Sequence, residues 1–444
     1  MKRYAQVGLG GRSSLFTDAA CGYDDAAILV GLCDLNIGRA QLAARDVKNK
    51  TGLDVPVYLD TDFSRMIRET KTDCVIVTTK DDKHDEYLCR AMELGCDAIT
   101  EKPMTTDEFK CRRILETQKR TGKNITVTFN YRYSPPRTQV KDLLMKGVIG
   151  EVLSVDFHWM LDVYHGADYY RRWHRRKENS GGLMVHKATH HFDLVNWWLS
   201  SVPQRVYASG QRSFYTPQMA DRIGLTQRTE RCYTCPHRAK ECQFGLNLAG
   251  TSGLKAMYLD QEIYDGYLRD LCVFSEDIDI EDSMNVVVDY ASGAIMTYSL
   301  NSFMPWEGYT VSFNGSTGRL EHKCEENVYI NGDGTVPGAL KGEGTFIRIY
   351  PHRKPAYELD LWQSAGGHGG GDGPLVHDVF AARKEEDPYK RAADQRSGAW
   401  SIMTGVAANH SMAQGRPFFI NELCPGIELP DYPAMPTGQE FLSV

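Results

Sequence analysis

The sequence of 444 residues lacks any apolar run of about 18 residues, the length that a membrane-spanning helix needs, so we expect no membrane span. It also lacks a block of basic residues, and its net charge of −7 argues against nucleic acid or an anionic membrane surface as a partner. The first residues, MKRYAQVGLGG, enter a strand-and-glycine pattern at once, so we expect no signal peptide and a cytoplasmic protein. The length of the chain is typical of a globular protein with roughly two to three domains.

The segment YAQVGLGGRSSLF is typical of a dinucleotide-binding loop. Its glycines stand where such a loop turns sharply and lets pyrophosphate approach the backbone: Gly8, Gly10 and Gly11. Ser13 replaces the usual third glycine. The next apolar strand, AILVGLCDLN, ends in Asp34, whose carboxylate suits the ribose hydroxyls of NAD and repels the 2′-phosphate of NADP. Arg39 opposes that preference, so the sequence favours NAD and leaves NADP as the less favoured cofactor.

Strands and helices alternate through the first part of the chain. Strands are predicted in TDCVIVTTK (72–80) and CDAITEKPMT (96–105), and helices in HDEYLCRAMELG (84–95) and DEFKCRRILETQKRTG (107–122). This alternation is typical of a parallel, doubly wound sheet. We therefore predict that residues 1–129 form an NAD-binding Rossmann domain.

After residue 130 the pattern changes to alternating, β-branched strands. They are predicted in GEVLSVDFHWMLDV, MNVVVDYASGAIMTYSLN and YTVSFNGSTGRLEHK, as in a sheet that is covered on one face. The segment AADQRSGAWSIMTGVAANHSMAQG predicts a helix whose small residues pack closely on the first domain. The predicted fold class is thus α/β, with a second, α+β domain over residues 130–444.

Four motifs, GLGGRS, VTTKDDKHDEY, ITEKPMT and FNYRYSP, together resemble the Gfo/Idh/MocA family of glucose–fructose oxidoreductase and inositol dehydrogenase. The resemblance implies a Rossmann domain followed by a domain with a large open, mostly antiparallel sheet. It also implies NAD(P)-dependent dehydrogenation of sugars, cyclitols or related polyols, with Lys102 as the active-site lysine beside the nicotinamide. Further cofactor contacts are expected at these positions: Arg12, Thr79, His84, Glu101, Lys102 and Asn130. We also expect a homo-oligomer, either a dimer or a tetramer.

The segment SGGLMVHKATHHFD (180–193) predicts an amphipathic helix with His186, His190 and Asp193 on one face. By resemblance, His190 takes the position of the family's catalytic histidine, whereas His186 stands where relatives carry an aspartate. We expect His190 to act as the general base beside Lys102, with His186 assisting. Asp193, one turn farther on, would orient His190 or another residue.

The departure at position 186 leaves three interpretations open. His186 shares proton relay with His190, or Lys187 approaches as a second cation. Alternatively, the two histidines hold a divalent metal together with a carboxylate such as Asp162.

A basic and aromatic loop, HGADYYRRWHRRKENSGG (165–182), precedes this helix. It is either a solvated charged segment or a site for a sugar or an anionic sugar. The glycine-rich segment 364–380 is either a flexible connector or a pocket edge from which His368 and Asp372 reach the substrate. The expected substrate contacts are Tyr131, Tyr170, Arg172, Trp173, His174, Lys187 and His368.

Three of the twelve cysteines, Cys232, Cys235 and Cys242, are closely spaced in a predicted insertion of about residues 210–275. They predict a structural zinc site, for which His237 and Cys272 are candidate fourth ligands. The alternative is a set of reduced thiols without metal. The other cysteines lie mostly in apolar segments and are expected to be free, buried thiols.

Together these patterns predict an NAD-dependent oxidoreductase that acts on a secondary hydroxyl of a sugar or sugar derivative. One alternative is an NAD-dependent glycosidase or lyase that works through transient sugar oxidation, elimination and re-reduction. Another is a non-catalytic NAD-binding regulator or sugar sensor. The expected partner is a small carbohydrate.

Overall fold

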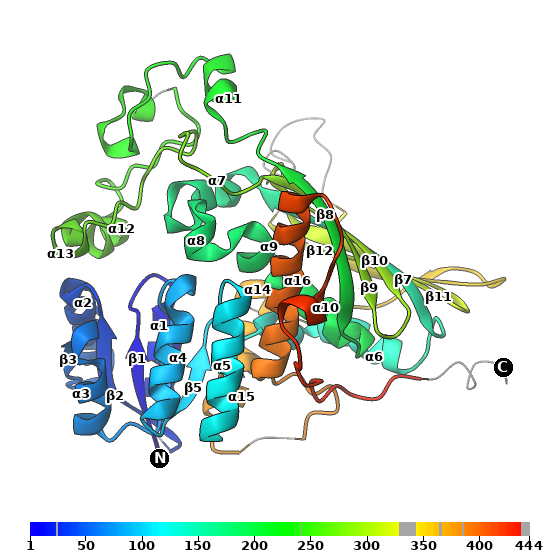
Figure 1. Cartoon of the computed structure of the whole chain (residues 1–444), viewed down its shortest axis with the longest axis horizontal. Coiled ribbons are helices and arrows are strands. Elements are labelled where there is room, and N and C mark those ends of the chain that lie inside the picture. Colours follow the sequence, from blue (N-terminus) through cyan, green and yellow to red (C-terminus); the bar gives the residue numbers. More distant parts are fainter. Residues whose placement is uncertain (24, 240, 328–342, 364–365, 384–385, 437–444) are drawn as a thin grey trace.

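The first sheet is parallel and has six strands in the order β3-β2-β1-β4-β5-β6 (Figure 1). The computed structural model describes residues 1–436 except 24, 240, 328–342, 364–365 and 384–385. The strands are β1 (Lys2–Val7), β2 (Ala27–Asp34), β3 (Val57–Leu59), β4 (Cys74–Val77), β5 (Asp97–Thr100) and β6 (Ile125–Val127). The sequence predicted four of them, and the prediction of a Rossmann fold is confirmed.

Helices cover both faces of this sheet because alternate strand residues are apolar on both sides. They are α1 (Ser13–Gly22), α2 (Ile37–Thr51), α3 (Phe63–Thr70), α4 (His84–Glu93) and α5 (Glu108–Thr121). Along β4, Cys74 and Ile76 join one apolar cluster, while Val75 and Val77 join the other. Two-sided burial of this kind explains why the strands form near-continuous apolar runs.

The second sheet has nine strands, and every neighbouring pair among them is antiparallel except β7 and β10. In chain order the strands are β7 (Val152–Asp162), β8 (Pro203–Gln211), β9 (Ser283–Tyr290), β10 (Ile295–Met304), β11 (Glu307–Gly315), β12 (Gly318–Asn327), β13 (Phe346–Pro351), β14 (Tyr357–Glu358) and β15 (Phe418–Phe419). The long helix α16 (Gln395–Gln414) packs between β8 and the first sheet's α5 and β6. The predicted open antiparallel sheet and the predicted helix are both present.

Two local predictions are wrong. The basic and aromatic segment is helical, with α7 (Val163–Arg171), a 3-10 turn (Trp173–Arg175) and α8 (Lys177–Ser180), and Asp162 caps α7 by accepting two backbone N–H groups. The histidine segment is two helices, α9 (Gly182–His186) and α10 (Thr189–Leu199). All side chains of both helices are buried, because α10 packs against α16, α6 (Pro135–Met145) and neighbouring turns. The predicted amphipathic helix is therefore wrong: the segment forms two helices that are buried on all sides.

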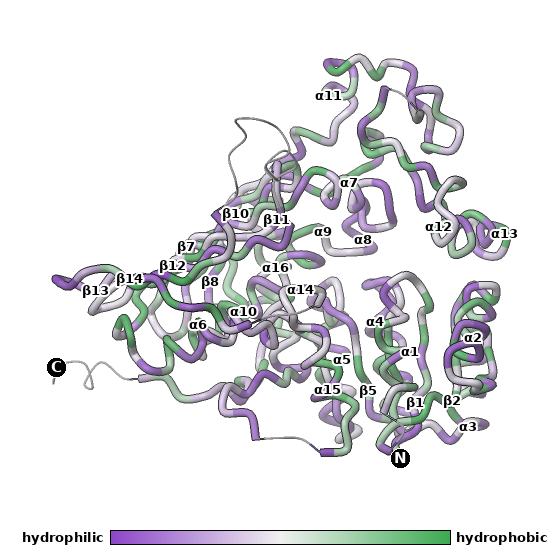
Figure 2. The backbone as a smooth tube through the Cα atoms, turned by 180° about the vertical axis from the view of Figure 1, so that it is seen from behind, coloured by the Kyte–Doolittle hydropathy of each residue, from purple (hydrophilic) through white to green (hydrophobic). Residues whose placement is uncertain are grey.

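A lobe of residues 212–282, inserted between β8 and β9, projects from the second sheet (Figure 1). Its helices are short: α11 (Pro217–Arg222), α12 (Ser252–Met257) and α13 (Glu262–Asp265). Both views place α12 and α13 beside the end of α2 (Figures 1 and 2). Across the residues described above, no helix combines the length and the apolar character that crossing a membrane requires.

Candidate active site

A cavity of about 700 Å³ runs between the glycine loop, the ends of the parallel strands, α9 and α10, and the lobe. This volume lies within the range of small-molecule sites, about 300–1,000 Å³. Most of the residues predicted for cofactor, substrate or catalysis line it: Gly8, Gly10, Gly11, Arg12, Asp34, Thr79, His84, Glu101, Lys102, Asn130, Tyr131, Arg172, Trp173, His174, His186, Lys187, His190 and His368.

Two predicted residues lie outside the described lining of this cavity. Ser13 is buried, and its hydroxyl donates to the carbonyl of Gly10 at 2.7 Å, so it braces the glycine loop from within. Tyr170 is also buried; its hydroxyl donates to the carbonyl of Glu281 at 2.9 Å, and its ring stacks on Tyr215. Tyr170 is thus a packing residue, which corrects its prediction as a substrate contact.

The adenosine end of the cavity is built around Asp34 at the end of β2. Its carboxylate accepts the N–H groups of Leu9 at 2.5 Å and Asn36 at 2.7 Å. Arg39 forms ion pairs with both Asp34 and Asp265 of the lobe. A 2′-phosphate would therefore meet two carboxylates, with the one nearby guanidinium already paired, and this arrangement suits NAD better than NADP.

The lobe contacts the cofactor loop directly, which the sequence analysis missed. The hydroxyl of Tyr258 accepts the N–H of Gly11 at 3.2 Å, and the Asn36 side chain donates to the carbonyl of Gln261 at 2.9 Å. With the Arg39–Asp265 pair, these contacts make the lobe a roof over this end of the cavity. The paired residues lie more than 200 positions apart, and no local pattern marked them.

Strand-end side chains order the middle of the cavity. Glu101 accepts the Nε–H of Arg12 at 2.8 Å. The His84 ring lies between the carbonyl oxygens of Pro103 at 2.8 Å and Thr79 at 3.2 Å. Buried groups with these partners hold the loops after β4 and β5 in place.

Lys102 follows β5, and its ammonium donates to the carbonyl of His186 at 3.2 Å. Burial lowers the pKa of Lys102 to about 8, although the negative charge of Glu101 opposes the decrease. A lysine with this pKa exchanges its proton near neutral pH, as acid–base and electrostatic roles require.

His190 lines the cavity, with its ring stacked on Tyr131 at a centroid distance of 4.3 Å. Burial, together with the charges of Lys102 and Lys187, lowers the pKa of His190 well below its ordinary value. Within the described chain its Nδ1 is buried without a hydrogen-bond partner. His190 is thus a neutral imidazole that can accept a proton.

His186 is paired with a carboxylate that the sequence analysis did not single out. Its Nδ1 lies 2.5 Å from Oδ2 of Asp81, which sits just beyond β4. Burial lowers the pKa of His186 and raises the pKa of Asp81, which favours a neutral pair sharing one proton. The resemblance implies an aspartate where this chain has His186, and Asp81 brings a carboxyl group to the same wall. Asp81 belongs to the motif VTTKDDKHDEY, but no pattern in the sequence predicted that it would pair with His186.

Asp193 does not orient His190. Both of its carboxylate oxygens accept hydrogen bonds from Arg132, at 2.7 and 2.5 Å, in a fully buried ion pair. Because the helix breaks between His186 and Thr189, the predicted common face of histidines and aspartate does not exist.

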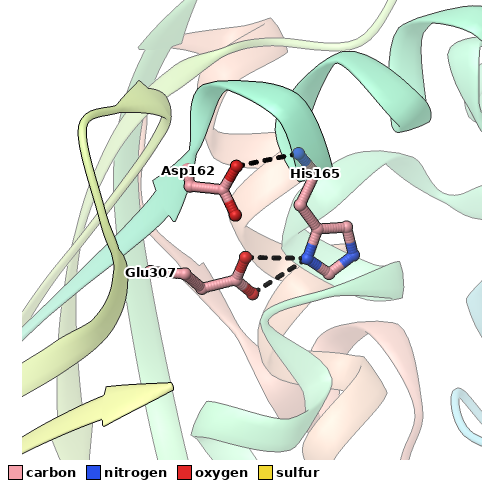
Figure 3. Close-up of side chains that lie close together, drawn as sticks. All are labelled: Asp162, His165 and Glu307. Atoms are coloured by element: carbon pink, nitrogen blue, oxygen red, sulfur yellow. Dashed lines mark hydrogen bonds and ion pairs between the residues drawn. The ribbon is translucent and has the colours of Figure 1, made fainter. Parts of the chain in front are cut away.

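A metal held by His186, His190 and Asp162 is not supported. His186 is engaged by Asp81, whereas Asp162 lies with His165 and Glu307, their ligand atoms within 4.8 Å of one another (Figure 3). His165 Nδ1 lies 2.8 Å from Glu307.

Glu307, one of these three residues, also anchors Lys187. The Lys187 ammonium donates to Glu307 at 3.2 Å and lies 4.5 Å from the centre of the Trp159 ring. Burial lowers the pKa of Lys187, but the charge of Glu307 outweighs it and raises the pKa above its ordinary value. The buried carboxylate is thereby neutralised by a cation of the chain itself.

The glycine-rich segment reaches the cavity through His368; residues 364–365 lie outside the described chain. Asp372 accepts hydrogen bonds from Arg12 at 2.9 Å and Asn130 at 2.7 Å, and it lies 2.9 Å from His368 Nδ1. One carboxylate thus connects the cofactor loop, the chain crossover and His368. The segment forms a pocket edge.

Arg172 and its neighbours line the lobe side of the cavity. Arg172 pairs with Asp168 at 3.3 Å, and the rings of Trp173 and His174 stack at 3.6 Å. The cysteines predicted for zinc lie elsewhere, around a separate small cavity inside the lobe.

Comparison with known proteins covers almost the whole chain. Residues 2–129 match the family model described as "Oxidoreductase family, NAD-binding Rossmann fold", and residues 141–420 match "Oxidoreductase family, C-terminal alpha/beta domain" of the same GFO_IDH_MocA family.

Among curated relatives, YteT of Bacillus subtilis (strain 168), named only as an oxidoreductase, is 37% identical over 378 residues, covering 83% of this chain and 86% of that protein. "Glycosyl hydrolase family 109 protein 1" of Akkermansia muciniphila is 30% identical over 193 residues, covering 41% and 40%. The WlbA dehydrogenase of Bordetella pertussis, solved with NADH and UDP-GlcNAcA, has the same fold, with a TM-score of 0.61, 16% identity and coverage of 94% and 99%.

Proposed function

Because the chain belongs to the Gfo/Idh/MocA family of oxidoreductases, we propose that it is an NAD-dependent dehydrogenase that oxidises a secondary hydroxyl of a sugar or sugar derivative. One observation carries this proposal: a single cavity joins the glycine loop and Asp34 to Lys102 and His190. Dinucleotide recognition and proton-transfer groups thus line the same space.

The residues at the adenosine end fit NAD. Apart from its chain neighbours, no atom of the described residues lies within 4 Å of the place that a side chain on Gly10 would take, so the backbone there is open to pyrophosphate. Asp34 and the paired Arg39 favour a ribose that carries free hydroxyls. NAD, when bound, supplies the hydride acceptor.

The chain's own residues move the proton. His190, neutral in its buried position, accepts the hydroxyl proton, and the Lys102 ammonium stabilises the negative charge that develops on the same oxygen. Lys187 stays cationic against Glu307 and donates hydrogen bonds to substrate oxygens. Trp173, on the cavity wall, offers an aromatic face to the apolar side of a sugar ring.

The second candidate is a glycosidase or lyase that returns the hydride. Transient oxidation acidifies the neighbouring C–H, and elimination releases the leaving group. In a glycosidase, water then adds to the double bond that elimination leaves, whereas in a lyase the double bond stays. Hydride return to the carbonyl completes the cycle, so no NADH accumulates. The glycosyl hydrolase family 109 relative and the additional proton-transfer groups, His186 with Asp81, favour this candidate.

A screen of monosaccharides and glycosides with NAD tests both candidates by following NADH absorbance and released sugar together. A dehydrogenase accumulates NADH in proportion to the oxidised sugar. Release of sugar without net formation of NADH would contradict the dehydrogenase and support the glycosidase or lyase. NAD binding without turnover of any carbohydrate would contradict both and favour a sensor.

We also propose a homo-oligomer formed through the open face of the second sheet. Along β9 the side chains alternate between buried and exposed, and apolar residues of four adjacent strands are exposed: Leu153, Tyr207, Val287 and Ile295. An apolar face of this kind is typical of an interface between subunits. Light scattering coupled to size exclusion would give a dimer or tetramer, whereas a monomer would contradict the proposal.

A further inference from the structure

Four cysteines converge inside the lobe. Cys232, Cys235 and Cys242 line a cavity of about 20 Å³, and Cys272 reaches the same cavity from a later segment. The backbone brings the two segments together, since the N–H of Cys232 donates to the carbonyl of Asp270 and the N–H of Cys272 donates to that of Glu230, both at 2.8 Å. None of these four cysteines forms a disulfide.

We propose that Cys232, Cys235, Cys242 and Cys272 bind one structural Zn²⁺ ion through their four sulfurs. A volume of about 10–15 Å³ already holds one water-sized probe, so the cavity has the size of a single ion. Four sulfurs and no oxygen ligand are the donor set of a closed, structural zinc site rather than a catalytic one.

The structure selects Cys272 over His237 as the fourth ligand. Nδ1 of His237 is paired with Glu241, and its Nε2 accepts the N–H of Gln227 at 3.3 Å. Both ring nitrogens are therefore engaged. Cys272, in contrast, lines the same cavity as the other three cysteines, and among the described residues its sulfur is hydrogen-bonded to a backbone N–H alone.

Backbone amides around the cavity point at sulfur. The N–H of Phe244 donates to Cys242, and the N–H of Phe274 donates to Cys272, each from two residues beyond the cysteine. The N–H of Leu246 likewise donates to Cys232. Hydrogen bonds to the ligand atom orient metal-bound thiolates and stabilise their charge.

Guanidinium groups lie near two of these cysteines: Arg171 acts electrostatically on Cys232, and Arg175 on Cys272. Arg171 and Arg175 are 6% and 2% exposed; Arg171 pairs with Asp168 and Arg175 with Asp277, and Arg175 keeps two side-chain nitrogens without a hydrogen-bond partner in the described chain. Arg228 also lines the cavity. A zinc ion with four thiolates carries a net charge of −2, which these cations would balance.

Binding requires the four sulfurs to move closer together and to release protons. Among the described residues, only the Asp162 group has three ligand atoms within 4.8 Å of one another, so the sulfurs must draw closer to reach Zn–S distances of about 2.3 Å. Cysteine binds Zn²⁺ as the thiolate, so each thiol must give up its proton on binding. Zn²⁺ displaces these protons into solvent as the four Zn–S bonds form.

The zinc site would fix the base of the roof over the cofactor. Arg231, next to Cys232, pairs with Asp270 and with Glu262 of α13. Asp265, at the end of the same helix, pairs with Arg39 beside Asp34. A lobe of short helices and turns gains most from such a metal, because it has little sheet structure of its own.

The test is metal analysis of the full chain, purified without a metal-affinity tag. We expect about one zinc per chain, and a loss of at least about tenfold in both Cys242→Ser and Cys272→Ser. Cys21→Ser, in α1, and His237→Ala should keep the zinc. Replacement by Co²⁺ should give a thiolate charge-transfer band and the visible absorption of a tetrahedral site.

Should the serine variants not fold, titrating the wild-type protein decides the question. A thiol reagent is added stepwise to the wild-type protein. As it modifies the four cysteines, zinc should be released and a zinc-binding dye should detect it. A wild-type chain without zinc, a disulfide within the cluster, an iron–sulfur absorption spectrum, or zinc loss in His237→Ala would each overturn the proposal. These zinc measurements do not depend on the substrate screen, because none of them requires the protein to turn over a substrate.

Discussion

Lys102 and Lys187 line the same cavity from two different walls, and their surroundings shift their pKa values in opposite directions. Lys102, on the Rossmann side, donates to a backbone carbonyl, and burial lowers its pKa to about 8. Lys187, on the helical side, is held by Glu307 and Trp159, and its pKa lies above the ordinary value.

Desolvation lowers the pKa of both lysines, so desolvation alone does not decide the pKa of a lysine. A buried carboxylate at 3.2 Å keeps Lys187 cationic, whereas Lys102 has no carboxylate hydrogen-bonded to its ammonium in the described chain. We therefore assign the proton-sensitive role to Lys102 and substrate holding to Lys187.

The largest expected effect comes from the Rossmann wall. Lys102→Met keeps the side-chain length and removes the cation, so kcat should fall about 10³-fold because charge on the substrate oxygen is no longer stabilised. Fluorescence titration should show NADH binding almost unchanged. The exposed Lys119→Met serves as the control, and wild-type kcat in the Lys102 variant would disprove the assignment.

The pH profile should show the same contrast. If the Lys102 ammonium acts as the cation and His190 as the base, deprotonation of Lys102 above its pKa of about 8 lowers kcat/KM about tenfold per pH unit. Lys187 stays charged over this range and adds no further decrease. A kcat/KM that rises through pH 8 would mean that the neutral Lys102 amine is the base instead.

A smaller effect is expected on the helical wall. Glu307→Gln removes the charge that fixes Lys187, so KM should rise about tenfold with kcat within about threefold. Steady-state kinetics on the substrate found in the screen measures both. Glu358→Gln, on the exposed edge strand β14, is the matched control, and a selective loss of kcat would contradict a holding role.

The smallest effect concerns the roof. Tyr258→Phe removes the hydroxyl that bonds to Gly11, and NADH affinity should fall about fivefold, the size of one hydrogen bond. Tyr357→Phe, exposed on β14, should bind NADH as the wild type does. Unchanged affinity in Tyr258→Phe would show that the roof does not contribute to cofactor binding.

The predictable parts of the site are the ones encoded locally. The glycine loop and Asp34 follow from the strand–turn–helix pattern, and Lys102 follows from the motif it shares with a known family. Their geometry is set by neighbouring residues, so the sequence carries it directly.

The other half of the site depends on contacts between distant segments. Asp81 and His186 are 105 positions apart, and Lys187 and Glu307 are 120 apart. The helical periodicity placed His186, His190 and Asp193 on one face, but periodicity cannot show that a helix is buried on every side and breaks in the middle. Asp193 consequently pairs with Arg132 rather than with the site.

The most direct test compares Lys102→Met and Lys187→Met side by side on the same substrate with NAD. The account predicts that the first variant loses kcat with little change in KM, whereas the second raises KM and retains most of kcat. A Lys102 variant that keeps kcat, together with a Lys187 variant that loses it, would contradict the account.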